Sequence, residues 1–175
     1  KFVFRVYSLN WRSKTEIDEE IKLLNQLKEN AIPISYALSD KESNYIQILS
    51  APEGDRFAVL FTFASGEKQH IISAETHFQI GQLIARLHRI TNNQKFNRID
   101  YTPEVILIDS LKKVSAFLKS DIEEMNFMRL AQRYLLKEFE NANISQIRQG
   151  IVHLDIWFDN LNITTNNQVT IFDFD

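Results

Sequence analysis

The segment from Gly150 to Asp175, GIVHLDIWFDNLNITTNNQVTIFDFD, constrains the fold more than any other part of the chain. It places acidic and amide side chains among apolar, strand-forming residues, and the turn-forming stretch TNNQ separates its two halves. This pattern predicts strand pieces, among them IVHLDIW, and a hairpin formed by NLNIT and VTIFDF. Such a hairpin would bring Asp155, Asn160 and Asp173 close together.

These three side chains carry oxygen atoms of the hard kind that Mg²⁺ prefers. In phosphoryl transfer, one carboxylate orients the attacking hydroxyl, while an amide and a second carboxylate hold metal on the nucleotide phosphates. Turn chemistry alone would explain Asn166, but it explains Asp173 poorly, because TIFDF is otherwise typical of a buried strand. We interpret His153 as a buried hydrogen-bonding residue that shapes the loop, rather than as a base or a metal ligand.

Glu20 is a second residue that constrains the fold. On a helical wheel it falls inside the apolar arc of the predicted helix at residues 13–30. A carboxylate that points into a core is costly unless a cation pairs with it. Arg5, which stands among apolar residues of the strand KFVFRVY, could be that cation. The alternatives are an isolated structural ion pair, or a Glu20 side chain that reaches the helix edge.

The order of the predicted elements indicates an α+β fold with two lobes. We expect strands at 1–7, 32–39, 44–51 and 56–64, helices at 13–30, 73–91, 103–119 and 122–141, and the hairpin at the end. Residues 1–64 would form a small antiparallel-sheet lobe with one helix. Residues 65–175 would form a mainly helical lobe that carries the hairpin.

Composition excludes several classes of function. The 175 residues are 44% hydrophobic, which suits one globular domain, and the net charge of −3 gives no case for binding nucleic acid or anionic membrane. The chain has no cysteine, which excludes disulfides and thiol chemistry and fits a cytoplasmic protein. Because both ends are abrupt, we expect the chain to be truncated at both ends.

Taken together, the motifs resemble those of the aminoglycoside phosphotransferase and choline kinase family, which has a protein kinase-like fold. VHLDIWFDN resembles the family's catalytic loop, and IFDFD resembles its metal-binding Asp-Phe-Asp segment. FRVY and EEIKLLNQL are similar to the strand and helix that carry a phosphate-contacting cation and its glutamate partner. FAVLFTFASGE is similar to the strand that runs into the adenine-binding hinge. The branch most similar to the chain holds a bacterial stress-response Ser/Thr kinase and type II homoserine kinases.

The resemblance implies an ATP-dependent, Mg²⁺-dependent phosphotransferase that acts on a hydroxyl of a small molecule or of a Ser/Thr side chain. Its implied residues are Asp155 as catalytic base or orienter, Asn160 and Asp173 as Mg²⁺ ligands, Arg5 at the α/β-phosphates with Glu20 as partner, and Phe61, Phe63 and Ala64 around adenine. No membrane or nucleic-acid partner is implied.

The chain also departs from the family pattern. Leu154 stands where the family usually has Gly, Arg5 stands where many relatives have Lys, and there is no Gly-rich phosphate loop. The Leu154 departure supports an alternative function, a catalytically impaired kinase-like module used for binding or regulation. A further alternative takes Asp-Phe-Asp as the metal motif of a nucleotide-sugar transferase or the nucleophile of a phosphatase. Those enzymes usually place it on a parallel sheet, whereas the strands here indicate antiparallel pairing.

Overall fold

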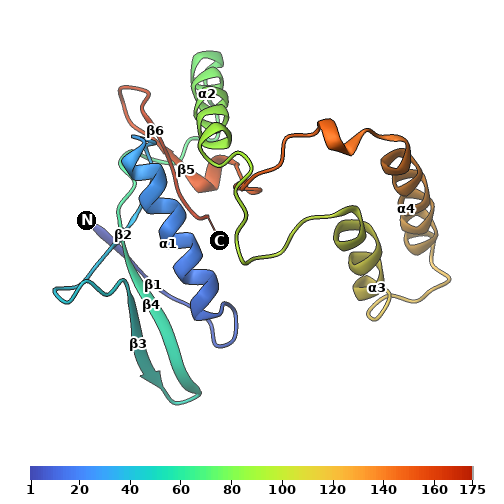
Figure 1. Cartoon of the computed structure of the whole chain (residues 1–175), viewed down its shortest axis with the longest axis horizontal. Helices are drawn as coiled ribbons and strands as arrows, with labels where there is room; N and C mark the ends of the chain where they lie inside the picture. Colours follow the sequence, from blue (N-terminus) through green and yellow to red (C-terminus); the bar gives the residue numbers. More distant parts are fainter. Residues whose placement is uncertain (175) are drawn as a thin grey trace. The chain divides into compact units, whose positions relative to one another are not determined.

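The computed structural model describes residues 1–174 of the chain, so the final aspartate lies outside the described residues. The chain divides into two compact units (Figure 1). Unit 1 comprises Lys1–Asn97 and Gln149–Asp175, and unit 2 comprises Arg98–Arg148. The lobe boundary expected after Ala64 does not coincide with this division, and the two lobes remain a proposal.

Unit 1 contains a four-stranded antiparallel sheet with β4 (Gly54–Thr62) at its centre. Strands β1 (Phe2–Val6), β2 (Ala37–Leu38) and β3 (Ile46–Ala51) all pair with β4. The predicted strand at 32–39 is mostly absent, because only two of its residues join the sheet. Pro33 lacks the N–H that a continuing ladder would need, and Ile34 instead bridges to Ile171 in the C-terminal hairpin.

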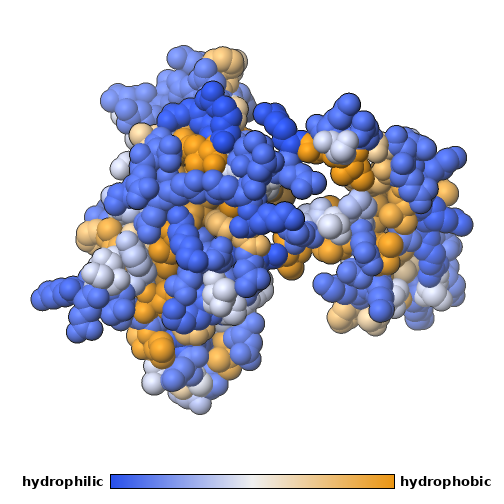
Figure 2. Space-filling model, in the orientation of Figure 1, coloured by the Kyte–Doolittle hydropathy of each residue, from blue (hydrophilic) through white to orange (hydrophobic). Residues whose placement is uncertain are grey.

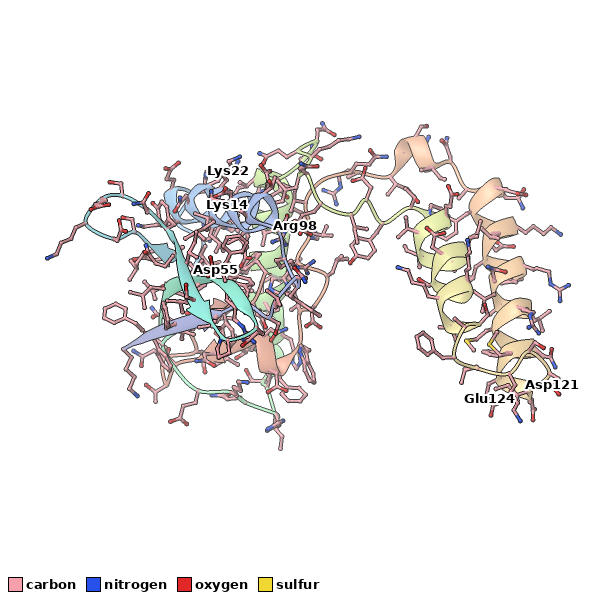
Figure 3. The ribbon with its side chains drawn as sticks, turned by 90° about the horizontal axis from the view of Figure 1, so that it is seen from below. Lys14, Lys22, Asp55, Arg98, Asp121 and Glu124 are labelled. Carbon is pink, nitrogen blue, oxygen red and sulfur yellow. The ribbon has the colours of Figure 1, made fainter. Side chains whose placement is uncertain are left out.

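Helix α1 (Lys14–Glu29) begins where the sequence predicts it. The Ser13 hydroxyl accepts a hydrogen bond from the Glu16 amide, and the Glu16 carboxylate accepts one from the Ser13 amide, forming a capping box. The outer face carries Lys14 and Lys22 (Figure 3), which form ion pairs with Asp18 and Glu19 respectively. The inner face buries the arc of the helical wheel, namely Ile17, Glu20, Ile21, Leu23, Leu24 and Leu27.

The C-terminal part of unit 1 is a short hairpin of β5 (Leu161–Ile163) and β6 (Val169–Ile171). It follows a short 3₁₀ turn at Phe158–Asn160, and helix α2 (Ala74–Ile90) contacts β6. The hairpin is confirmed, but the prediction of strand structure in IVHLDIW is wrong. This segment pairs with no strand; instead, Ile151 O accepts from the side chain of Thr91 just after α2.

One hydrophobic core joins the sheet, α1, α2 and the hairpin of unit 1. It contains Leu24 and Leu27 from α1, Val59 from β4, Leu87 from α2 and Ile171 from β6, each nearly inaccessible to solvent. The hairpin therefore packs in the same core as α1 and the sheet. This shared core brings Arg5 of β1, Glu20 of α1 and Asp173 after β6 close together.

Unit 2 is helical and buries little of its own surface. It contains a π-helical stretch at Glu104–Asp109, α3 (Ser110–Val114), α4 (Glu123–Asn141) and a 3₁₀ turn at Ile144–Gln146. The helix predicted at 103–119 is thus shorter and partly π-helical, whereas the helix at 122–141 is confirmed. Met125 is the one buried hydrophobic residue described in this unit, and Figure 2 shows apolar side chains at its surface.

Candidate active site

A cavity of about 440 Å³ lies in unit 1. This volume is within the usual range of small-molecule sites. Six of the eight predicted site residues line the cavity: Arg5, Glu20, Phe61, Phe63, Ala64 and Asp173. They come from β1, α1, β4, the segment after β4 and the segment after β6, so residues far apart in the sequence meet here. Asp155 and Asn160 do not line the cavity.

Arg5 connects two acidic side chains that line this cavity, the buried Glu20 and the partly exposed Asp173. Its Nη1 lies 3.9 Å from Glu20 Oε1, and its Nη2 donates a hydrogen bond to Asp173 Oδ1. Glu20 is 2% exposed and also accepts from the Tyr7 hydroxyl at 3.4 Å. The predicted Arg5–Glu20 ion pair is therefore confirmed. The Arg5–Asp173 pair is an addition that the sequence patterns did not predict.

The surroundings of Arg5 keep its guanidinium charged. Burial lowers the pKa of Arg5, but the hydrogen bond and charge of Asp173, followed by the charge of Glu20, raise the pKa above its ordinary value. Arg5 is a part-buried cation whose two carboxylate partners both line the cavity. A permanently charged, forked donor in this place suits an anionic ligand such as a phosphate group.

Asp155 and Asn160 are held together in the loop before the hairpin. Asn160 Nδ2 donates to Asp155 Oδ2 at 2.7 Å and to the Asp155 carbonyl at 3.0 Å. The Asn160 carbonyl accepts from the amide of Phe172, the residue before Asp173. The structure thus links the predicted catalytic residue to the segment that carries Asp173, although the exposed Asp155 does not lie in a strand as we expected for IVHLDIW.

His153 is buried and orders this loop. Its Nε2 is 3.0 Å from the Phe172 carbonyl, and its Nδ1 lies 3.4 Å from the Asp155 amide nitrogen. Its ring packs on that of Phe174, with 4.4 Å between the ring centroids. Burial lowers the pKa of His153 despite the opposing effects of the Phe172 carbonyl and the charges of Asp155 and Asp173. The structure confirms the predicted buried, hydrogen-bonded histidine.

Leu154 adopts a left-handed backbone conformation, with φ of 67°. Glycine takes this conformation without strain, whereas a residue with a Cβ pays about 1–2 kcal/mol. The loop therefore keeps the backbone that a Gly at this position would favour, although Leu is present. Asp173 is also left-handed, with φ of 68°. Both residues lie in the segments predicted to carry chemistry, where strained backbone is common, although five other non-glycine residues of the described chain also have positive φ.

The segment after β4 is tied to the hairpin by contacts that sequence reasoning missed. Glu67 and Ile163 exchange two backbone hydrogen bonds of 2.9 and 3.0 Å, and Asn162 Nδ2 donates to the Ala64 carbonyl at 2.8 Å. Lys68 pairs with Asp159 at 3.0 Å. Asn162 and Lys68 also line the cavity. The burial of Asn162 had one available signal, its position between two apolar residues of a predicted strand.

The donor set fits a magnesium ion bound together with nucleotide phosphates. Asp173 offers a carboxylate and Asn160 an amide oxygen, both hard ligands. Within residues 1–174 no cluster of three or more His, Asp or Glu side chains could hold a metal on its own. Mg²⁺ is usually bound by only one or two carboxylates plus substrate phosphates. Asn160 and Asp173 as Mg²⁺ ligands therefore stay a prediction that the chemistry permits.

A comparison with protein-family models shows which family the chain belongs to. The model of APH, the phosphotransferase enzyme family, matches residues 1–175. The chain belongs to this phosphotransferase family. An uncharacterized protein, sll1119, of Synechocystis sp. is 28% identical over 99% of the chain and 49% of its own length. An uncharacterized protein of Deinococcus radiodurans is 24% identical over 99% of the chain and 50% of its own length.

Solved structures of kinases share the fold of this APH family member. It superimposes on a microcompartment-associated aminopropanol kinase with a TM-score of 0.81 and 19% identity, over 99% of the chain and 57% of the kinase. With amicoumacin kinase hAmiN, in complex with AMP-PNP, Ca²⁺ and Ami, the TM-score is 0.76 and the identity 17%, over 99% and 52%. The kinase-like α+β fold is thus confirmed.

The chain spans about half the length of the curated relatives it matches. The family and the fold therefore rest on the whole of this chain but on only part of its relatives. Within residues 1–174, no helix has the length and apolar character needed to cross a membrane.

Proposed function

We propose that the protein is an ATP-dependent, Mg²⁺-dependent phosphotransferase that transfers the γ-phosphate of ATP to a hydroxyl group. The observation that carries the proposal is the arrangement of Arg5 between Glu20 and Asp173 in a cavity that the segment around Ala64 also lines. A fixed cation, a metal-binding carboxylate and an apolar wall for a base are the parts that phosphoryl transfer from a nucleotide requires.

Each residue has a separate role in this proposal. Arg5 binds the α- and β-phosphates, and Glu20 fixes the direction of its guanidinium group. Phe61 and Phe63 supply apolar and aromatic surface for the base, and the backbone at Ala64 supplies hydrogen-bonding groups. Asp173 and Asn160 would hold Mg²⁺, which when bound neutralises charge on the phosphates.

Asp155 orients the acceptor hydroxyl and receives its proton. One of its carboxylate oxygens accepts from Asn160 at 2.7 Å, which fixes the orientation of the carboxylate. The other oxygen has no hydrogen-bond partner within residues 1–174 and is available to the acceptor. Catalysis then comes mainly from positioning and from charge stabilisation. The left-handed backbone at Leu154 supports this reading over an impaired binding module, because the loop keeps its Gly-like geometry.

We propose a small molecule as the acceptor, with a protein Ser/Thr side chain as the alternative. The solved structures with this fold include an aminopropanol kinase and an amicoumacin kinase, both named for small-molecule substrates. An acceptor screen should therefore begin with amino alcohols, aminoglycosides and homoserine, followed by serine-containing peptides.

The experiment is a titration of the full-length protein with ATP, with and without Mg²⁺, followed by thermal unfolding. A ligand at about 100 times its Kd stabilises the folded state by about 2.7 kcal/mol, so millimolar ATP should raise the Tm by several degrees. Asp173→Ala should abolish the Mg²⁺-dependent part of this rise. Asp55→Ala, which changes an exposed carboxylate of β4 (Figure 3), is the matched control. Equal stabilisation of both variants by MgATP would refute the proposed site.

A further inference from the structure

Asn162 is a buried polar residue in the wall of the candidate nucleotide site. It is the middle residue of β5, between Leu161 and Ile163, and it is 8% exposed. It lines the cavity together with Ala64 and several aromatic side chains. A buried amide side chain is unfavourable unless hydrogen bonds satisfy it. The partners of Asn162 therefore show what the residue does.

The partner of Asn162 is the segment predicted to bind the base. Its Nδ2 donates to the Ala64 carbonyl at 2.8 Å and lies 3.4 Å from the Gly66 carbonyl. Because Ala64 and Asn162 both line the cavity, this hydrogen bond lies at the cavity wall. Within residues 1–174, the amide N–H of Ala64 has no hydrogen-bond partner. At Ala64 the backbone thus offers its N–H to a ligand, while its carbonyl already accepts from Asn162.

This pattern bears on the choice between purine bases. Adenine carries an exocyclic amino group, a donor, where guanine carries an oxygen, an acceptor. A free backbone carbonyl would select adenine by accepting from that amino group. A backbone N–H serves both bases, because it can donate to a ring nitrogen of adenine or to the oxygen of guanine. The amide side chain of Asn162 also carries an oxygen, which can accept a hydrogen bond from an N–H group of guanine.

We propose that Asn162 is a specificity-determining residue that weakens the selection of ATP over GTP, by engaging the Ala64 carbonyl. This inference rests on the proposed function, since it concerns the base of the same nucleotide. It assigns Asn162 no contact with the reacting phosphate. The full-length protein should therefore bind both purine nucleotides with similar affinity.

The first test uses the unaltered protein and does not depend on a variant that folds. We would measure the Kd values of ATP, GTP and purine riboside triphosphate, which lacks the 6-amino group, by calorimetry with Mg²⁺. One neutral hydrogen bond changes a Kd by about two- to twelvefold. We expect ATP and GTP to differ by less than about fivefold, and loss of the amino group to weaken binding by less than about fivefold. A larger effect in either comparison overturns the inference.

The second test changes Asn162 itself. Asn162→Leu keeps the number and branching of the side-chain heavy atoms but frees the Ala64 carbonyl, so the preference for ATP over GTP should rise by at least about fivefold. Thr170→Val is the matched control, because Thr170 pairs with Asn162 in the hairpin but does not line the cavity. An unchanged ratio in a folded Asn162→Leu that still binds nucleotide overturns this inference and leaves the proposed function intact. If the unaltered protein binds neither nucleotide, both the proposed function and the inference about Asn162 are wrong.

Discussion

Single residues in this chain take strained conformations where the predicted chemistry lies. Leu154 is the clearest case, since its side chain is 62% exposed and its φ of 67° costs free energy that packing does not return. The family resemblance identified the departure from Gly at this position, but sequence alone could not say whether the backbone changes with it. In the structure the backbone at this position is left-handed, so Leu154 has the conformational strain that a glycine would avoid.

Leu154→Gly should raise the free energy of unfolding by up to about 1 kcal/mol. The gain is the relieved strain of about 1–2 kcal/mol, reduced by the greater freedom of Gly in the unfolded chain. Leu154→Ile should lower stability, because a β-branched residue is poorly tolerated at positive φ. Val152→Gly, at an exposed residue two positions earlier, is the control and should only destabilise. Urea denaturation measures all three, and a destabilised Leu154→Gly would contradict the strain argument.

Helices and strands set the relative positions of the site residues. The contact between the segment after β4 and strand β5 depends on a close approach of two backbones at Gly66. Gly66 has φ of 97°, and a Cβ at this position would lie 2.4 Å from the carbonyl carbon of Ile163 in β5. The segment after β4 can therefore lie against the hairpin only because Gly66 lacks a side chain. The same contact places Asn162 next to the Ala64 carbonyl.

Gly66→Ala should destabilise the protein by about 2 kcal/mol or more, since it combines positive φ with a backbone overlap that cannot relax cheaply. Gly81→Ala is a matched control in α2, where an added Cβ meets no atom within 4 Å. That change should stabilise the protein by roughly 0.5–1 kcal/mol through helix propensity. Chemical denaturation of both variants measures the difference. Similar effects of the two substitutions would show that the segment has room to move away from β5.

At the level of elements, the sequence predicted the structures that follow from hydrophobic periodicity. It did not predict the contacts that depend on the position of backbone groups. The wheel that placed Glu20 among apolar residues predicted α1, its buried face and the ion pair with Arg5, because helix periodicity and the cost of a buried charge act locally. IVHLDIW was misread as a strand, since only Ile151 and Ile156 of its apolar residues pack against the core and the segment pairs with no described strand. The role of Asn162 was missed because its hydrogen-bond partner is the backbone carbonyl of Ala64. Every residue has a backbone carbonyl, so the sequence does not indicate which one a side chain will bind.

At the scale of the whole molecule, the stability of the fold is linked to the protonation of a buried residue near the site. In the tautomer consistent with its neighbours, His153 Nε2–H donates to the Phe172 carbonyl, and Nδ1 accepts from the Asp155 amide. A second proton on Nδ1 would place two N–H groups face to face. This geometry and the burial that lowers the pKa of His153 both favour the neutral ring in the folded state.

The sign of the pH dependence follows from this lowered pKa. The unfolded chain protonates His153 near its ordinary pKa of about 6.5, whereas the folded protein does so only at lower pH. Between these two values the unfolded state binds more protons, so the free energy of unfolding falls as the pH is lowered below about 6.5. The loss stops once the pH is below the folded pKa. Arg5 adds no pH dependence in this range, because its raised pKa keeps it charged throughout.

Asp40 acts in a separate and lower window. Hydrogen bonds, the largest from the Asn44 amide, lower the pKa of its carboxyl below 3.8, so its contribution is lost only on stronger acidification. A decline in stability that begins near pH 6.5 is therefore assigned to His153 and not to this aspartate. Asp155 and Asp173, whose charges act on His153, are kept unchanged in the variants that test this assignment.

His153→Gln should make the free energy of unfolding less dependent on pH just below about 6.5, because the variant lacks the imidazole whose pKa the fold lowers. Its stability at pH 7.5 should be lower, since the ring contact with Phe174 is lost. The exposed His88 of α2 offers the control His88→Gln, which removes one histidine without touching the core. Urea denaturation at several pH values gives the slopes. A slope in His153→Gln equal to that of the unaltered protein would mean that the acid sensitivity arises elsewhere in the fold.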